Sequence, residues 1–165
     1  MYKAGDMVMY GSFGICKITA IEKLDFTGEE QEYYILKHGS SDKNTFYVPT
    51  HSKAALCKMH RICSRSEVDA LISHMNEAEL IWIDNDIKRK EAYSRIIKDA
   101  DRHEIIRLIK TLYLRRKELA GIGKKLRSAD ENFLAAAENM LFEEFAYALE
   151  IDRNEVVTYI ENHIA

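Results

Sequence analysis

The first third of the chain consists of short apolar runs separated by turns. The runs are rich in the β-branched and aromatic residues that favour strands, and they span residues 7–10, 15–24, 31–37 and 44–48. Turn-forming residues stand around and between them, namely Gly5, Gly11, Gly14, Gly28 and Gly39, with Ser40, Ser41 and Asp42. Four or five short antiparallel strands at this spacing predict a small β-barrel of the SH3 or Tudor kind.

The second of these runs departs from strict alternation of apolar and polar residues. From Ile15 to Ile21 the order is Ile, Cys, Lys, Ile, Thr, Ala, Ile. A regular strand would not keep all the apolar members of this run on one face. We therefore predict a β-bulge near Lys17 or Ile18.

From Ser66 onward the hydrophobic period is that of helices. Four pairs of a capping residue and an acidic residue three positions later mark the expected helix starts. The pairs are Ser66 with Asp69, Asp101 with Glu104, Ser128 with Glu131, and Asp152 with Glu155. The apolar stripe expected in residues 102–119 comprises Ile105, Ile109, Leu112 and Tyr113. Residues 129–149 carry a second apolar stripe, with acidic residues outside it.

These two patterns predict an α+β protein. A small Tudor- or SH3-like barrel is expected over residues 1–64 and an all-α multi-helix domain over residues 65–165. The chain has 165 residues, of which 47% are hydrophobic, enough for two small domains of modest stability. It has no run of ~18 to 20 consecutive apolar residues and no apolar leader, so we expect a cytoplasmic protein with three reduced cysteines and no membrane contact.

Charge falls into blocks of opposite sign, which the net charge of -3 conceals. Residues 87–127 carry 14 Lys or Arg and 5 Asp or Glu, a surplus of nine positive charges. The flanking residues 67–86 and 128–165 are strongly acidic. A basic helical block of this kind indicates contact with a phosphate backbone. The alternative is that basic and acidic helices neutralise each other inside the domain.

Candidate catalytic and metal-binding residues are few. Cys57, His60 and Cys63 stand at two-residue gaps with His51 upstream, and thiolate and imidazole are zinc ligands. No second cluster completes a familiar zinc motif, so reduced cysteines are the simpler interpretation. The glycines within residues 120–127 lack the spacing of a phosphate-binding loop and fit a helix C-cap. We expect no catalysis, metal, cofactor or small-molecule substrate.

Trp82 is the only tryptophan and lies between an acidic loop and the basic block. One interpretation is an apolar anchor buried in the core. The other is an exposed wedge that stacks on nucleobases or inserts between them. The sequence leaves both open, although burial is the more common state of such a side chain.

Several short motifs are spread along nearly the whole chain. The first half carries Gly5-Asp6-x-Val8-x-Tyr10, Gly14-Ile15-Cys16-x-Ile18, Tyr33-Tyr34 and Tyr47-Val48-Pro49. The second half carries the basic stretch 102–117, the helix start at 128–131 and the stretch 141–148. Together these motifs resemble the CarD/CdnL family of bacterial transcription regulators, whose N-terminal domain also occurs in transcription-repair coupling factor. The helicase motifs of the coupling factor are not present in this sequence.

This resemblance implies a non-catalytic regulator, associated with the nucleoid through RNA polymerase. Its Tudor-like domain would bind the polymerase β subunit, and its helical domain would make a weak, sequence-tolerant contact with promoter DNA. That contact would lie at the upstream edge of the transcription bubble, where a family tryptophan presses on the minor groove, and would stabilise the open complex.

The resemblance and the charge pattern together assign residues to the two contacts. The residues expected at the polymerase are Lys23, Leu24, Phe46, Tyr47 and Val48. Leu24 and Tyr47 stand where some relatives have arginines, which predicts a more apolar contact. The residues expected at DNA are Trp82, Lys88, Arg89, Lys90, Arg95, Arg115, Arg116, Lys117, Lys124, Lys125 and Arg127.

Two other classes of function stay open from the sequence. A protein-binding adaptor without DNA contact would share every feature except salt-dependent binding to a forked duplex. A small metalloprotein using the cysteine cluster would be revealed by metal analysis.

Overall fold

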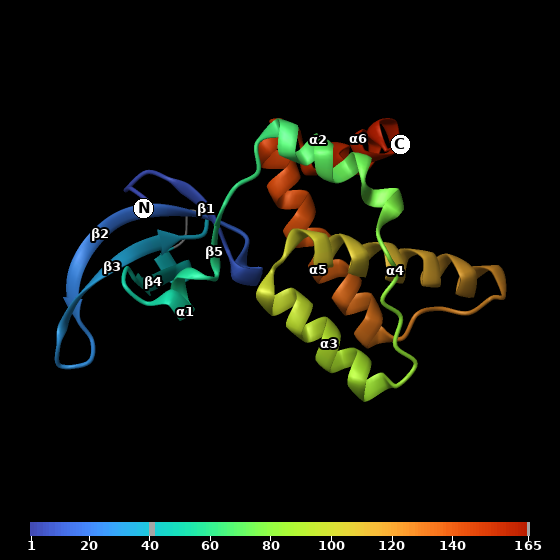
Figure 1. Cartoon of the computed structure of the whole chain (residues 1–165), viewed down its shortest axis with the longest axis horizontal. Helices are drawn as coiled ribbons and strands as arrows, with labels where there is room; N and C mark the ends of the chain where they lie inside the picture. Colours follow the sequence, from blue (N-terminus) through green and yellow to red (C-terminus); the bar gives the residue numbers. More distant parts are fainter. Residues whose placement is uncertain (40–41, 165) are drawn as a thin grey trace. The chain divides into compact units, whose positions relative to one another are not determined.

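The computed structural model describes residues 1–39 and 42–164 and divides into two compact units, Met1–Ile62 and Cys63–Ala165 (Figure 1). The first unit is built around strands and the second from helices, so the predicted α+β class is confirmed. The turn expected at Ser40 and Ser41 lies outside the described residues.

Five strands form one antiparallel sheet in the first unit. Along the chain they are β1 (Met7–Tyr10), β2 (Ile15–Asp25), β3 (Glu30–Lys37), β4 (Thr45–Pro49) and β5 (Met59–Arg61). Short helical turns stand between them, η1 (Gly11–Phe13), η2 (Asp42–Asn44) and α1 (Lys53–Leu56). The order within the sheet is β4-β3-β2-β1-β5. Because β4 and β5 form its two edges, the sheet is open where a closed barrel was expected.

The core of the first unit is formed mainly by alternate residues of these strands. Its members are Val8, Cys16, Ile18, Tyr34, Leu36, Val48 and Met59, all buried. The predicted bulge is present in β2 but one residue later than expected. Ile18 pairs with Leu36 and Ala20 pairs with Ile35, which leaves Thr19 as the additional residue. Its hydroxyl donates to the carbonyl of Ile35 at 3.1 Å, so the bulge places a polar side chain outside the core.

The second unit packs its helices around a central one. They are α2 (Arg65–Ser73), the short turn η3 (Met75–Glu77), α3 (Asp86–Asp99), α4 (Arg102–Gly121), α5 (Ser128–Leu149) and α6 (Arg153–His163). The long helix α5 contacts α2, α3, α4 and α6. Its apolar stripe forms the middle of the core, with Leu134, Ala137, Met140, Leu141 and Phe145 buried.

The apolar stripe of α4 is confirmed except at its end. Ile105 and Leu112 are buried, and Ile109 packs partly against the core. Tyr113 was expected on the same stripe but is 49% exposed. Leu108 is buried instead of Tyr113. The buried face of α4 follows positions 105, 108 and 112, and position 113 lies about 100° round the helix from position 112.

Two of the four expected helix starts are confirmed. Asp101 caps α4, its carboxylate accepting from the amide of Glu104 at 3.1 Å. Asp152 is the N-cap of α6, and its amide donates to the Glu155 carboxylate at 2.9 Å. Both of these helix starts join an acidic N-cap to a glutamate three positions later.

The other two predicted capping residues were wrong. Helix α2 is capped by Ser64 with Glu67, two residues before the predicted pair, because these residues form the reciprocal bonds of a capping box. This places Ser66 inside the first turn. The N-cap of α5 is Arg127, which leaves Ser128 as the first helical residue.

Two ion pairs, one buried and one partly buried, fasten α5 to its neighbours. The Arg89 guanidinium of α3 donates from Nε and Nη2 to the two carboxylate oxygens of Asp130 at 3.0 Å each. Side-chain exposures of 5% and 2% show that this pair is out of water. Arg102 of α4 pairs in the same two-pronged manner with Glu144, which is 3% exposed. Such pairs tolerate loss of one partner poorly, because the other charge stays buried.

We predict that Asp130→Ala lowers the free energy of unfolding of the second unit by about 3 kcal/mol, since it removes the main counter-charge of buried Arg89. Urea unfolding followed by Trp82 fluorescence measures this directly. The matched control is Glu131→Ala, whose carboxylate lies 3.6 Å from Arg116 with both side chains more than 40% exposed; its cost should stay below about 1 kcal/mol. Equal losses in the two variants would contradict the assignment.

Candidate functional site

An extended strap, residues 78–84, leads from η3 to α3 and crosses α4 (Figure 1). Extended chain outside a sheet has no neighbouring strand to pair its carbonyl groups, so these need other donors. Lys110 of α4 supplies one such donor, because its Nζ lies 2.7 Å from the carbonyl oxygens of both Asn76 and Ala78. This lysine therefore fixes the beginning of the strap on α4.

Further side chains hold the strap along its length. Arg107 donates from Nε to the carbonyl of Glu79 at 3.1 Å, and the hydroxyl of Thr111 accepts from the amide of Ile81 at 3.0 Å. From α3, the hydroxyl of buried Tyr93 donates to the carbonyl of Ile81 at 2.9 Å. The strap is thus fixed between two helices before it reaches Trp82.

The strap brings Trp82 to the edge of the core. Its side chain is half-buried and packs partly against the apolar cluster of the second unit. The indole Nε1 donates to the Asp84 carboxylate at 3.0 Å. Two guanidinium carbons lie over its ring, those of Arg89 at 4.5 Å and Arg115 at 4.9 Å from the centroid. Trp82 therefore combines features of the two interpretations, because it packs partly against the core and keeps part of its surface exposed.

The two arginines over Trp82 differ in how they are held. A guanidinium over an indole contributes about 0.5–1 kcal/mol at an exposed site and about 2 when desolvated. The Nε of Arg115 is buried there without a hydrogen-bond partner among the described residues, which costs about 1–3 kcal/mol. Gain and cost are of similar size, so Arg115 rests on the ring only weakly.

Arg89 was expected at DNA, and the structure corrects that expectation. Its side chain is 5% exposed, and beyond the bonds to Asp130 it donates to Asp86 at 2.8 Å and to the carbonyl of Ile83 at 2.8 Å. All three nitrogens of the guanidinium thus donate hydrogen bonds within the unit. Arg89 was assigned to DNA because it stands in a run of three basic residues with Lys88 and Lys90. That run does not show which of the three side chains is buried.

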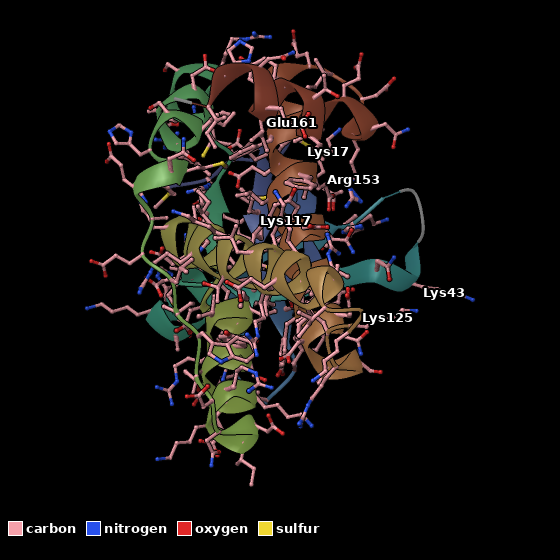
Figure 2. All side chains as sticks on the ribbon, turned by 90° about the vertical axis from the view of Figure 1, so that its right-hand side faces the viewer. Lys17, Lys43, Lys117, Lys125, Arg153 and Glu161 are labelled. Atoms are coloured by element: carbon pink, nitrogen blue, oxygen red, sulfur yellow. The ribbon has the colours of Figure 1, made fainter. Side chains whose placement is uncertain are left out.

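Other predicted DNA residues are exposed and carry no ion pair within the described chain. They are Lys88, Lys90, Arg95, Lys117, Lys124 and Lys125. Figure 2 shows Lys117 on α4 and Lys125 in the loop that follows it. Two further predicted residues pair at the surface, Arg115 with Glu118 at 3.3 Å and Arg116 with Glu131 at 3.6 Å. The basic block therefore keeps a substantial unpaired positive charge.

The loop after α4 is joined to the start of α3. Helix α4 ends at Gly121, and Gly123 adopts a positive φ of 72° with its amide donating to the carbonyl of Ala120 at 3.1 Å. This is the predicted C-cap. Arg127 then pairs with Asp86 of α3. The hydrogen bond from Arg89 and the charge of Arg127 together lower the pKa of Asp86. The loop lysines and the first turn of α3 thus belong to one basic surface.

The first unit exposes the predicted polymerase residues unevenly. Tyr47 on the edge strand β4 is 48% exposed, Lys23 is exposed, and Leu24 and Phe46 are half-buried. Val48 was also expected in the contact, but its side chain is fully buried in the sheet core. Side chains of a strand alternate between its faces, so Val48 can contribute only its backbone.

Sequence reasoning missed two exposed aromatic residues next to these positions. Phe26, at the β2–β3 hairpin, is 57% exposed and its ring centroid lies 5.2 Å from that of Tyr47. Phe13 is 54% exposed, and its ring centroid lies 4.5 Å from that of Phe46, the residue of β4 that precedes Tyr47. An aromatic residue inside a polar turn is the only signal that could have identified either.

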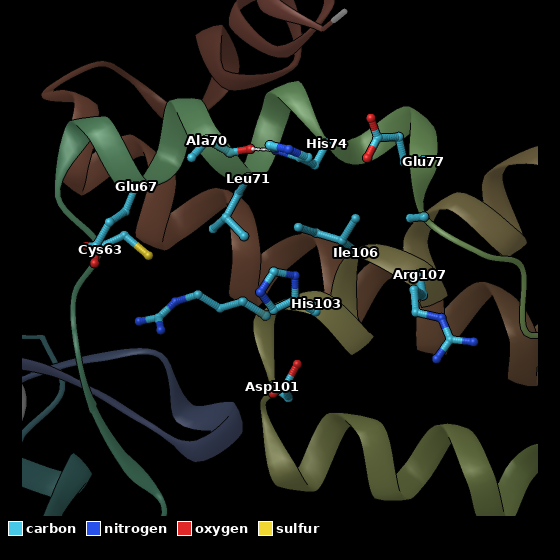
Figure 3. Close-up of a pocket in the computed structure, with 12 residues that line it drawn as sticks. Cys63, Glu67, Ala70, Leu71, His74, Glu77, Asp101, His103, Ile106 and Arg107 are labelled. Atoms are coloured by element: carbon cyan, nitrogen blue, oxygen red, sulfur yellow. Dashed lines mark hydrogen bonds between the residues drawn. The ribbon is translucent and has the colours of Figure 1, made fainter.

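A hollow of about 550 Å³ lies between α2 and α4 (Figure 3). Leu71 and Ile106 form part of its apolar lining, and His74 and His103 stand at its wall. The Nδ1 of His74 lies 2.8 Å from the carbonyl of Ala70. No residue of this hollow was singled out from the sequence as functional apart from Cys63.

Cys63 lines the same hollow and has an unreactive thiol. Burial, with the nearby Glu144 carboxylate, raises the pKa of its thiol to about 12. Its backbone amide donates to Glu144 at 3.0 Å, the carboxylate that also binds Arg102. The thiol therefore stays protonated near neutral pH and does not act as a nucleophile.

Within residues 1–39 and 42–164 no three His, Cys, Asp or Glu side chains are arranged to hold a metal ion. None of the helices described there has the length and apolarity that crossing a bilayer requires.

Models of two protein domains match the two halves of the chain. The one described as CarD-like/TRCF RID domain matches residues 2–63, and the one described as CarD, C-terminal domain matches residues 70–161. The stranded and helical units correspond to these two matches. The CarD family is a family of non-catalytic transcription regulators, and its domains indicate interaction with RNA polymerase. The chain therefore belongs to the CarD/CdnL family of transcription regulators.

Proposed function

We propose that this protein binds the β subunit of RNA polymerase through the β4 edge and contacts promoter DNA through the strap and the basic surface. The contact lies at the upstream edge of the transcription bubble and stabilises the open complex in the cytoplasm. The observation that carries the proposal is Trp82, partly exposed on a fixed strap in a unit whose exposed lysines form no ion pair among the described residues.

The polymerase contact is supported by the chemistry of the sheet edge. Strand β4 pairs with β3 on one side and ends the sheet on the other. An edge strand accepts an added strand through main-chain hydrogen bonds, and neighbouring side chains then give specificity. Tyr47 and Phe26 form an exposed aromatic pair beside this edge, which suits an apolar patch on the partner strand.

The DNA contact is supported by the type and number of exposed cations. Lysines position a protein on phosphates without reading sequence. The partly exposed indole of Trp82 can stack on bases that are already unpaired at the edge of a bubble. Each contact alone is weak, and binding to polymerase raises the local concentration of DNA at the second unit.

A protein-binding adaptor without DNA contact is the second candidate. It is favoured by one observation, the use of Arg89, Arg102, Arg107 and Lys110 inside the unit. These residues account for part of the positive surplus, so only the remaining exposed cations distinguish the two candidates.

We predict that Tyr47→Ala weakens binding of the full chain to the isolated β-subunit lobe by about 2 kcal/mol, as expected for an aromatic hot spot. Surface plasmon resonance measures the loss. Tyr147→Ala is the matched control, because Tyr47 and Tyr147 are both 48% exposed and Tyr147 lies on α5. Equal binding by the two variants would remove Tyr47 from the contact.

We predict that Lys88→Glu with Lys90→Glu shortens the open-complex lifetime and lowers the salt slope of binding to a forked duplex by about two, since each phosphate contact contributes about 0.9. The control is Lys53→Glu with Lys58→Glu, an equal charge change at exposed sites of the first unit. A salt slope that stays at the wild-type value would favour the adaptor.

A further inference from the structure

Trp82 has two arginines over its ring, and they come from different helices. Arg89 belongs to the first turns of α3 and Arg115 to the second half of α4. The bonds made by the rest of each side chain decide which of the two is able to leave the ring.

Arg89 cannot leave without breaking buried bonds. Its guanidinium donates to both oxygens of Asp130, to Asp86 and to the carbonyl of Ile83. These bonds also hold the last residues of the strap, so movement of Arg89 would release Trp82 itself. Arg89 is therefore the fixed partner of the ring.

Arg115 is held much less firmly. Its side chain is 40% exposed, and its ion pair is a 3.3 Å contact with Glu118, which is 69% exposed and on the same helix. Its Nε is buried without a hydrogen-bond partner among the described residues. Moving the guanidinium off the ring would give this donor access to a partner.

We propose that Arg115 is an exchangeable cover of Trp82. In the free protein its guanidinium lies over the indole; when DNA binds, the guanidinium moves from the ring to a backbone phosphate and a nucleobase takes its place on the indole. This deepens, and rests on, the proposed contact of Trp82 with DNA. No covalent step is involved.

In this exchange both Arg115 and Trp82 gain a new partner for the one that they lose. A phosphate oxygen accepts from Nε and Nη of arginine in a two-pronged geometry, which satisfies the donor that is unpaired over the ring. Stacking of a base on the indole replaces the cation–π contact that is lost. Both exchanges need a phosphate and an unpaired base at the same place, so a regular duplex supplies only one of them. The cover therefore makes Trp82 selective for DNA whose bases are unstacked beside a backbone.

The single tryptophan makes the test direct, because all indole fluorescence comes from Trp82. In the free full-length protein, Arg115→Gln should raise the acrylamide quenching constant about twofold, because loss of a weak cation–π contact leaves the indole uncovered. Arg115→Lys should raise it similarly, since lysine lacks the planar group. Arg153→Gln, an equal charge change on α6, should leave it at the wild-type value.

The second half of the proposal is tested with a forked duplex. On saturation with this DNA, quenching of Trp82 in the wild type and in Arg115→Gln should fall to the same value, because a base covers the ring in both. The salt slope of Arg115→Gln should be lower by about one, the loss of one phosphate contact, and Arg115→Lys should retain the wild-type slope. Thermal melting confirms that each variant is folded.

The outcomes separate this inference from the proposed function. Unchanged quenching in free Arg115→Gln would show that Arg115 does not cover the ring, and an unchanged salt slope would show that it does not move to phosphate. Either result overturns the inference while DNA binding by the wild type stands. Absence of wild-type binding to the fork would overturn the proposed function and this inference together.

Discussion

The second unit depends on the buried pair between Arg89 and Asp130. A guanidinium and a carboxylate lose water when buried, and good geometry and additional acceptors must offset that loss. Here the additional acceptors are Asp86 and the carbonyl of Ile83. The bonds therefore form together only when α3, α5 and the end of the strap are all in place. This makes the position of Trp82 a consequence of helix packing and not of loop conformation.

The same principle explains why the charge of the chain is arranged in blocks. The acidic block contains no cation to satisfy the carbonyls of the strap, and Lys110 and Arg107 of the basic block do so. The two interpretations of the basic block, internal neutralisation and a phosphate surface, thus apply to different residues. Cations facing the strap or α5 are used for folding, whereas Lys88, Lys90 and Lys117 point to water.

Three of the exposed apolar side chains of the first unit, Phe13, Phe26 and Tyr47, lie on or beside the edge strand β4. Phe46 and Tyr47 are consecutive residues of β4 and so face opposite sides of the strand. Phe13 packs on the first and Phe26 on the second. An unpaired strand edge invites association, which proteins usually suppress with charges. Aromatic groups on both sides of β4 favour association instead, in agreement with the interaction of this family with RNA polymerase.

The sequence by itself determined the α+β class, the bulge in β2 to within one residue, the caps at Asp101 and Asp152, and the basic surface. These features depend on local periodicity and on hydrogen bonds between near neighbours, which a sequence displays directly. Only the tertiary structure decided that Arg89 is buried while Lys88 and Lys90 are exposed, that Val48 faces the core, and that Ser64 caps α2. Burial depends on residues far away in the chain, such as Asp130, 41 positions from Arg89. A local pattern carries no information about that partner, and for this reason the contacts around Trp82 could not be predicted.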